Sequence, residues 1–197
     1  MISNGEIYKA LDDSSKKRII MYLTARQFKN AVSIEEMIIV PTNGLPENTK
    51  LCLGNGLIKI TARGDRTISK HYPFLVNKAF ACEVYLKFLL LEYNINFKNL
   101  KGKNGHNLLK LYEKVPLDFK KSLLRYVSSR GTLNNESLMI KLKSVSEVFT
   151  EWRYIYEKFD GNSADFAFLD TFCNFLDESC RKEILKKYNY NVELDIR

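Results

Sequence analysis

YPFLVNKAFACEVYLKFLLLEYN, residues 72–94, is the most apolar stretch of this 197-residue chain. Apolar side chains occupy nearly every angular position around a helix here, and a helix that is apolar on all sides is a buried one. The stretch is long enough to cross a bilayer, but Lys78, Glu83 and Lys87 fall in its middle, where charges are costly. It therefore predicts a central core helix and no membrane span.

The composition is that of a soluble globular protein, with 45% apolar and 27% charged residues. The length predicts one domain with a substantial core. A formal net charge of +8 favours polyanions such as nucleic acid or nucleotides, but Lys and Arg are scattered along the chain, so a solvated basic surface is an equal alternative. The four cysteines form no CxxC pair and the amino terminus has no secretory pattern, which predicts a cytoplasmic protein.

Apolar residues recur at helical spacing on both sides of the central helix. A first helix is expected from about Ser14, with Asp12 and its neighbours offering capping oxygens. Four more helical segments follow residue 105: a short one opened by His106, one beginning at Pro116, a continuous one over residues 135–159, and a last one over residues 163–188 with Leu176 and Leu185 inward. Their short connections imply antiparallel neighbours, so the sequence predicts an all-α, up-and-down bundle.

The segment between the first and the central helix has a different character. Residues 35–66 contain six of the chain's Pro and Gly residues and short apolar runs, which suit strands or extended loops. Asn55-Gly56 fits a tight hairpin turn. We therefore divide the chain into an N-terminal helix and loop/hairpin extension, residues 1–66, and a helical bundle, residues 67–197.

The chain carries no common motif for metal or nucleotide chemistry. It has no GxxxxGK[ST] loop, no GxGxxG after a strand, no HExxH and no Cys/His cluster with zinc spacing. No metal and no cofactor are therefore expected. His71 and His106 are the only histidines available for acid–base work near neutral pH.

Polar residues on the apolar helices are more informative. Glu83 and Lys87 lie four residues apart, as do Arg153 and Glu157, so each couple can pair along a helix, and Tyr156 lies beside the second. Charges near a core must be matched. These residues form either an interior network that fixes helix register or the lining of a ligand-binding or active site. The sequence leaves both open, because partly buried charged groups with perturbed pKa values occur in both.

The succession AFACEVYLKFLL (79–90), GHNLLKLYEKVP (105–116), EVFTEWRYIYEKF (147–159) and a final Phe-rich helix resembles the HEPN superfamily of helical proteins. The resemblance covers residues 72–187. It implies a bundle of four or five helices, a homodimer, and association with nucleotides or RNA, commonly in toxin–antitoxin or antiphage systems. It also implies that a polar cluster binds the ligand, formed by Glu83, Lys87, His106, Arg153, Tyr156 and Glu157.

The nuclease motif of that superfamily departs from this sequence. Nuclease members carry R-x(4–6)-H on a late helix, whereas Arg153 is followed at that spacing by Lys158, Phe159 and Asp160. The one match is Arg66 with His71, just before the central helix. As a catalytic pair, the Arg would stabilise phosphorane charge and the His would transfer a proton at the ribose 2′-hydroxyl.

Three functions are therefore compatible with the sequence. The first is a HEPN-like binding module that recognises a nucleotide, RNA or a partner protein. The second is a metal-independent ribonuclease toxin that uses Arg66 and His71. The third is an antitoxin-like or scaffold subunit that binds another protein, in which the polar cluster is purely structural.

Overall fold

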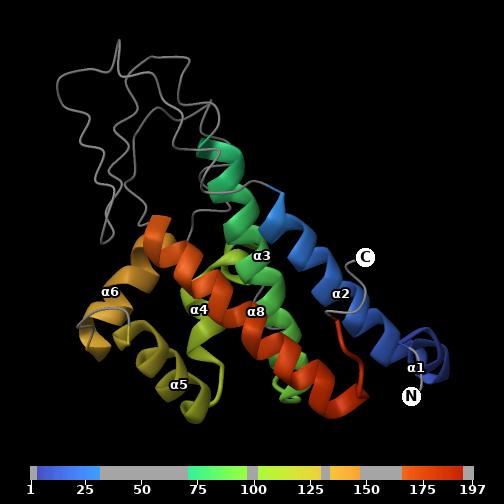
Figure 1. The fold of residues 1–197 in the computed structure, drawn as a ribbon. Coiled ribbons are helices and arrows are strands. Elements are labelled where there is room, and N and C mark those ends of the chain that lie inside the picture. Colours follow the sequence, from blue (N-terminus) through green and yellow to red (C-terminus); the bar gives the residue numbers. More distant parts are fainter. Residues whose placement is uncertain (1–3, 32–70, 97–101, 130–133, 147–165, 193–197) are drawn as a thin grey trace.

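The computed structural model of this chain describes residues 4–31, 71–96, 102–129, 134–146 and 166–192, and these are helical with no strand among them (Figure 1). The all-α prediction is thereby confirmed for this part of the chain. The predicted hairpin around Asn55-Gly56 lies outside the described residues. The elements in chain order are α1 (Asn4–Ala10), α2 (Asp13–Asn30), α3 (His71–Glu92), the 3₁₀ helix η3 (Gly102–His106), α4 (Leu108–Glu113), α5 (Leu117–Ser128), α6 (Asn135–Val145) and α8 (Phe166–Tyr188).

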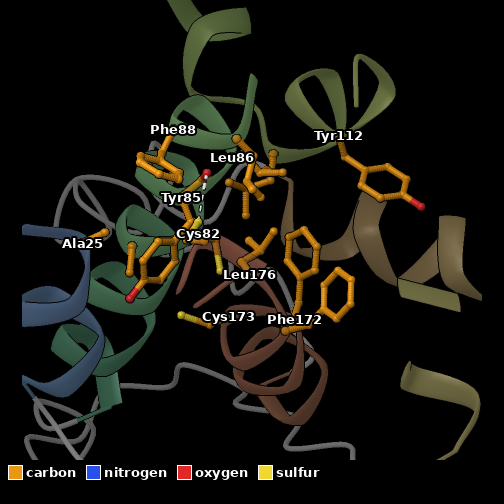
Figure 2. Packing of buried hydrophobic residues seen from close by; sticks show 14 of the residues in the cluster. Ala25, Cys82, Tyr85, Leu86, Phe88, Tyr112, Phe172, Cys173 and Leu176 are labelled. Atoms are coloured by element: carbon orange, nitrogen blue, oxygen red, sulfur yellow. Dashed lines mark hydrogen bonds between the residues drawn. The ribbon is translucent and has the colours of Figure 1, made fainter. Parts of the chain in front are cut away.

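Helix α3 lies at the centre, with α2 and α8 on two sides of it and α4 on a third (Figure 1). Its side chains Cys82, Tyr85 and Phe88 have no exposed surface, and they belong to the same core as Phe172 and Leu176 of α8 (Figure 2). The prediction of a central core helix is confirmed. No described helix combines the length and the low charge that a bilayer span requires.

The contacts of α3 give the directions of its neighbours. Along α2, Arg18 pairs with Glu92, whereas Phe28 packs on Phe80 with ring centroids 4.6 Å apart, so α2 and α3 are antiparallel. Along α8 the order is reversed, because Asp170 pairs with Lys78 and Lys187 pairs with Glu92. Helices α3 and α8 therefore run parallel, and the antiparallel expectation from short connections does not extend to this pair.

Helices α1 and α2, which the sequence assigns to an N-terminal extension, contribute to the same core as α3. Ile19, Tyr22 and Ala25 of α2 have no exposed surface. The side chain of Asn4 donates a hydrogen bond to the carbonyl of Asn191 at 2.6 Å. The two ends of the described chain are thus held together.

Short polar side chains set the beginnings of the helices. The Asp12 carboxylate accepts a hydrogen bond from the Ser15 N–H at 2.8 Å, which separates α1 from α2 as the sequence allows. The predicted helix start at His106 is wrong: His106 ends η3, and Asn107 caps α4 by accepting from the Lys110 N–H at 3.0 Å. An amide oxygen on a short side chain caps a helix better than an imidazole.

The continuous helix predicted over residues 135–159 is also wrong in its extent. Helix α6 ends at Val145, where the Ser146 N–H bonds to the Lys143 carbonyl three residues earlier. The Ser146 carbonyl accepts a hydrogen bond at 2.9 Å from the Leu108 N–H, in the first turn of α4. This bond pairs an N–H group at the start of α4 with a carbonyl at the end of α6, and neither group has a partner within its own helix. The end of α6 therefore depends on this contact and not on the apolar periodicity. Residues 147–165, Trp152 included, lie outside the described residues.

Candidate functional site

Three of the predicted cluster residues meet at the surface of α3. The Glu83 carboxylate lies 2.6 Å from the Lys87 Nζ, and its two oxygens lie 3.0 Å and 3.1 Å from the His106 Nδ1. Glu83 is only 2% exposed, whereas 44% of the His106 side chain is exposed. A buried carboxylate thus holds one lysine and one histidine that extend towards solvent.

The local fold explains this meeting. Lys87 follows Glu83 by four residues, so both lie on one face of α3. His106 belongs to η3, which follows α3 in the chain. Because η3 ends at His106 and Asn107 caps α4, the imidazole is placed two residues before the first residue of α4, which packs on α3 and α6.

The arrangement can bind an anion at the surface. The buried Glu83 carboxylate accepts a hydrogen bond from Lys87 and contacts the His106 imidazole, so it holds both side chains at the surface. Both partners are N–H donors suited to phosphate oxygens. The carboxylate also fixes the imidazole through Nδ1, which orients the opposite ring nitrogen away from Glu83.

The remaining predicted site residues cannot be placed in this cluster. Arg66, Arg153, Tyr156 and Glu157 lie outside the described residues. His71 is the first residue of α3, and its side chain is not among those described.

A second polar cluster, which sequence reasoning missed, is centred on Asp177 of α8. This carboxylate is 3% exposed and accepts hydrogen bonds from Tyr22 at 2.8 Å, Tyr85 at 3.1 Å and Lys29 at 2.7 Å. The Arg181 Nε lies 3.8 Å away. Burial alone would raise the pKa of Asp177, but the hydrogen bond and charge of Lys29 outweigh it and hold the pKa below its ordinary value.

The two tyrosines of this cluster stay protonated. Burial, reinforced by the charge of Asp177, raises the pKa of Tyr22 and of Tyr85 far above the ordinary value of a phenol. Both hydroxyls therefore remain donors. The cluster joins α2, α3 and α8. The Asp177 carboxylate is buried and bonded to residues of all three helices, so we interpret the cluster as a structural one.

A third cluster lies at the carboxyl end of α3. Arg18 pairs with the buried Glu92 at 3.0 Å, Lys187 pairs with it at 2.9 Å, and Tyr188 donates a hydrogen bond at 2.8 Å. Burial, reinforced by Glu92, raises the pKa of Tyr188 to about 12. This cluster also joins α2, α3 and α8.

One signal in the sequence could have found these contacts. Lys78, Tyr85 and Glu92 are spaced seven residues apart on α3, which is about two helical turns, so they lie along one face. Each meets a polar residue of α8: Asp170, Asp177 and Lys187 respectively. A regular polar row on an otherwise apolar helix indicates a paired helix with its own polar row.

The cysteines of the described chain are packing residues. Cys82, Cys173 and Cys180 are fully buried, as expected for small apolar side chains, and burial raises the pKa of Cys82 and Cys180. Cys52 lies outside the described residues. Within the described ranges, no three His, Cys, Asp or Glu side chains are placed to hold a metal ion together.

Comparison with known proteins returns no match: no family model, no curated protein and no solved structure is detectably similar to this chain. The resemblance to the HEPN superfamily therefore rests on the motifs quoted above.

Proposed function

We propose that this protein is a HEPN-like binding module that binds RNA through the Glu83, Lys87 and His106 cluster. One observation supports the proposal most: Glu83 of AFACEVYLKFLL and His106 of GHNLLKLYEKVP, two separate stretches of the resemblance, meet at 3.0–3.1 Å. The His106 side chain is 44% exposed there. Chance motif matches would have no reason to converge in space. The biological setting that goes with the proposal is a toxin–antitoxin or antiphage system.

The charge of the chain supports a polyanionic ligand. A formal net charge of +8 attracts RNA at long range, and neutralising phosphates with Lys and His releases condensed counterions. We expect phosphate contacts to dominate, which makes binding strongly dependent on salt and weakly dependent on sequence. The proposal includes a homodimer, for which the exposed apolar side chains Leu117 and Ile140 offer contact surface.

Fluorescence anisotropy with a labelled single-stranded RNA tests this proposal. At about 50 mM salt we expect a dissociation constant of about 1–100 µM, and a log–log salt slope between about −2 and −4, since each contact contributes about −0.7. Light scattering on the same samples should give the mass of a dimer. With EDTA present the RNA should remain intact on a denaturing gel.

Each alternative has its own signature in this experiment. Absence of an anisotropy change at about 50 mM salt, with the folded protein at tens of micromolar, would contradict RNA binding and favour the protein-binding subunit. Cleavage of the RNA in EDTA that is lost in His71→Ala would favour the ribonuclease toxin. A monomeric mass would contradict the dimer alone.

A further inference from the structure

Two open cavities adjoin on the side of α8 that faces away from α3. Each has a volume of about 330 Å³. One lies between α5 and α8, the other between α8 and the turn that follows it, and Glu178 and Lys182 line both. They therefore form one groove, the α8 groove, which follows about 15 Å of helix from Phe175 to Leu185 at 1.5 Å per residue.

The groove is lined by cations that are available to a ligand. Arg125 of α5 and Lys182 of α8 are exposed, and within the described part of the chain neither side chain has a hydrogen bond or an ion pair. Lys121, one turn before Arg125, lies instead at another cavity and is 4.0 Å from Asp118. The groove thus presents the positive charges of Arg125 and Lys182, which no described residue neutralises through an ion pair.

A third cation of the groove, Arg181, is positioned by a buried carboxylate. Arg181 lines the groove, and its Nε lies 3.8 Å from the buried Asp177 carboxylate. Asp177 is itself held by Lys29, Tyr22 and Tyr85. Such an anchor reduces the entropy that the arginine loses when it binds an anion.

One carboxylate lies among these cations. The Glu178 Oε1 accepts a hydrogen bond from the Tyr126 hydroxyl at 3.2 Å, so the side chain is held at the groove. A carboxylate repels phosphate but accepts a hydrogen bond from a ribose 2′-hydroxyl. That hydroxyl is the group by which a protein tells RNA from DNA.

We propose that the α8 groove binds the sugar–phosphate backbone of single-stranded RNA, with Arg125, Arg181 and Lys182 on phosphates and Glu178 on a ribose hydroxyl. This inference rests on the proposed RNA-binding function and adds a second contact surface, on different helices from the Glu83 cluster. Two of the aromatic rings that line the groove are buried, because Phe175 is 7% and Tyr190 is 5% exposed. The third, Tyr126, is half-buried and its hydroxyl is held by Glu178. Base stacking therefore contributes little, and binding is independent of sequence.

A pair of double variants with equal loss of charge on the same two helices tests this inference. The groove variant is Arg125→Gln/Lys182→Gln. The control is Lys121→Gln/Lys186→Gln, whose residues are exposed and line neither cavity of the groove. In RNA anisotropy titrations the groove variant should bind about tenfold or more weakly, with a salt slope smaller by about 1.4, since each lost contact removes about 0.7. The control should change affinity by less than about threefold.

A DNA oligonucleotide of the same sequence tests the role of Glu178. Wild-type protein should bind the RNA about tenfold more tightly than the DNA, as expected for one hydrogen bond to a charged acceptor. Equal affinities would overturn that role.

The remaining outcomes separate the groove from the proposed function. Equal losses in the groove and control variants would overturn the groove as a defined site. RNA binding that is normal in the groove variant but weakened by His106→Ala would overturn the groove and keep the proposed function. A wild-type protein without RNA affinity would overturn both. An acidic peptide that binds in place of RNA, and is lost in the groove variant, would overturn RNA as the occupant.

Discussion

Replacement of Asp177 by Ala is expected to lower the free energy of unfolding by about 3–5 kcal/mol, one of the two largest effects that we expect from a single substitution in this chain. The carboxylate is 3% exposed and satisfies Lys29, Tyr22 and Tyr85 together. Without it, two buried hydroxyls and the Lys29 ammonium lose their acceptor. Urea denaturation followed by circular dichroism measures the change.

Asp118→Ala is the matched control, because that side chain is 97% exposed. Its loss should stay below about 1 kcal/mol. A loss for Asp177→Ala no larger than that of the control would contradict the assigned network.

The same carboxylate gives the stability a defined pH dependence. Its pKa in the folded state lies below the ordinary value, so its contribution is fully present above about pH 4 and is lost as the pH falls through the folded pKa. The stability of the wild type should therefore fall more steeply below about pH 4 than that of Asp177→Ala. Parallel acid profiles of the two proteins would contradict a lowered pKa.

Leu176→Ala is expected to cost about 3–5 kcal/mol, because this leucine has no exposed surface and packs between α8 and the centre of α3 (Figure 2). Removal of its side chain leaves a cavity that rigid helices fill only in part. Leu185 lies on the same helix and is 52% exposed, so Leu185→Ala should cost less than about 1 kcal/mol. Thermal or urea unfolding of both variants makes the comparison.

This pair of leucines tests the fold as well as the energy. The sequence predicts both side chains to be inward, whereas the structure buries one and exposes the other. Similar losses for the two variants would contradict the observed orientation of the carboxyl-terminal part of α8.

The features that the sequence could predict are those that follow from the pattern of residues within one helix. Residues 72–94 are apolar on all sides, which can only suit a helix at the centre, and α3 lies there. The Glu83–Lys87 pair follows from helical spacing alone. The contact of His106 with Glu83 came from the family resemblance and was not predictable from spacing.

The remainder depends on tertiary contacts that periodicity does not encode. The end of α6 is fixed by a hydrogen bond between Ser146 and Leu108, which belong to different helices. Leu185 follows the buried Ile184 but lines the α8 groove, on the side of α8 that faces away from α3, although α3 contacts α8 as far as Tyr188. The polar row of α3 marks the face that pairs with α8, but local spacing does not specify the parallel direction of that pairing, on which the Asp177 cluster depends.

The central claim, that the Glu83 cluster binds RNA, is tested most directly by RNA anisotropy titrations of His106→Ala and Lys87→Gln. Each single variant leaves Glu83 one of the two partners that it has among the described residues, so the fold should persist with a loss of about 1–2 kcal/mol. Each should bind RNA about fivefold more weakly than the wild type, while Lys121→Gln should bind within about twofold of it. If both cluster variants are folded and bind RNA as tightly as Lys121→Gln, the cluster is not the binding site.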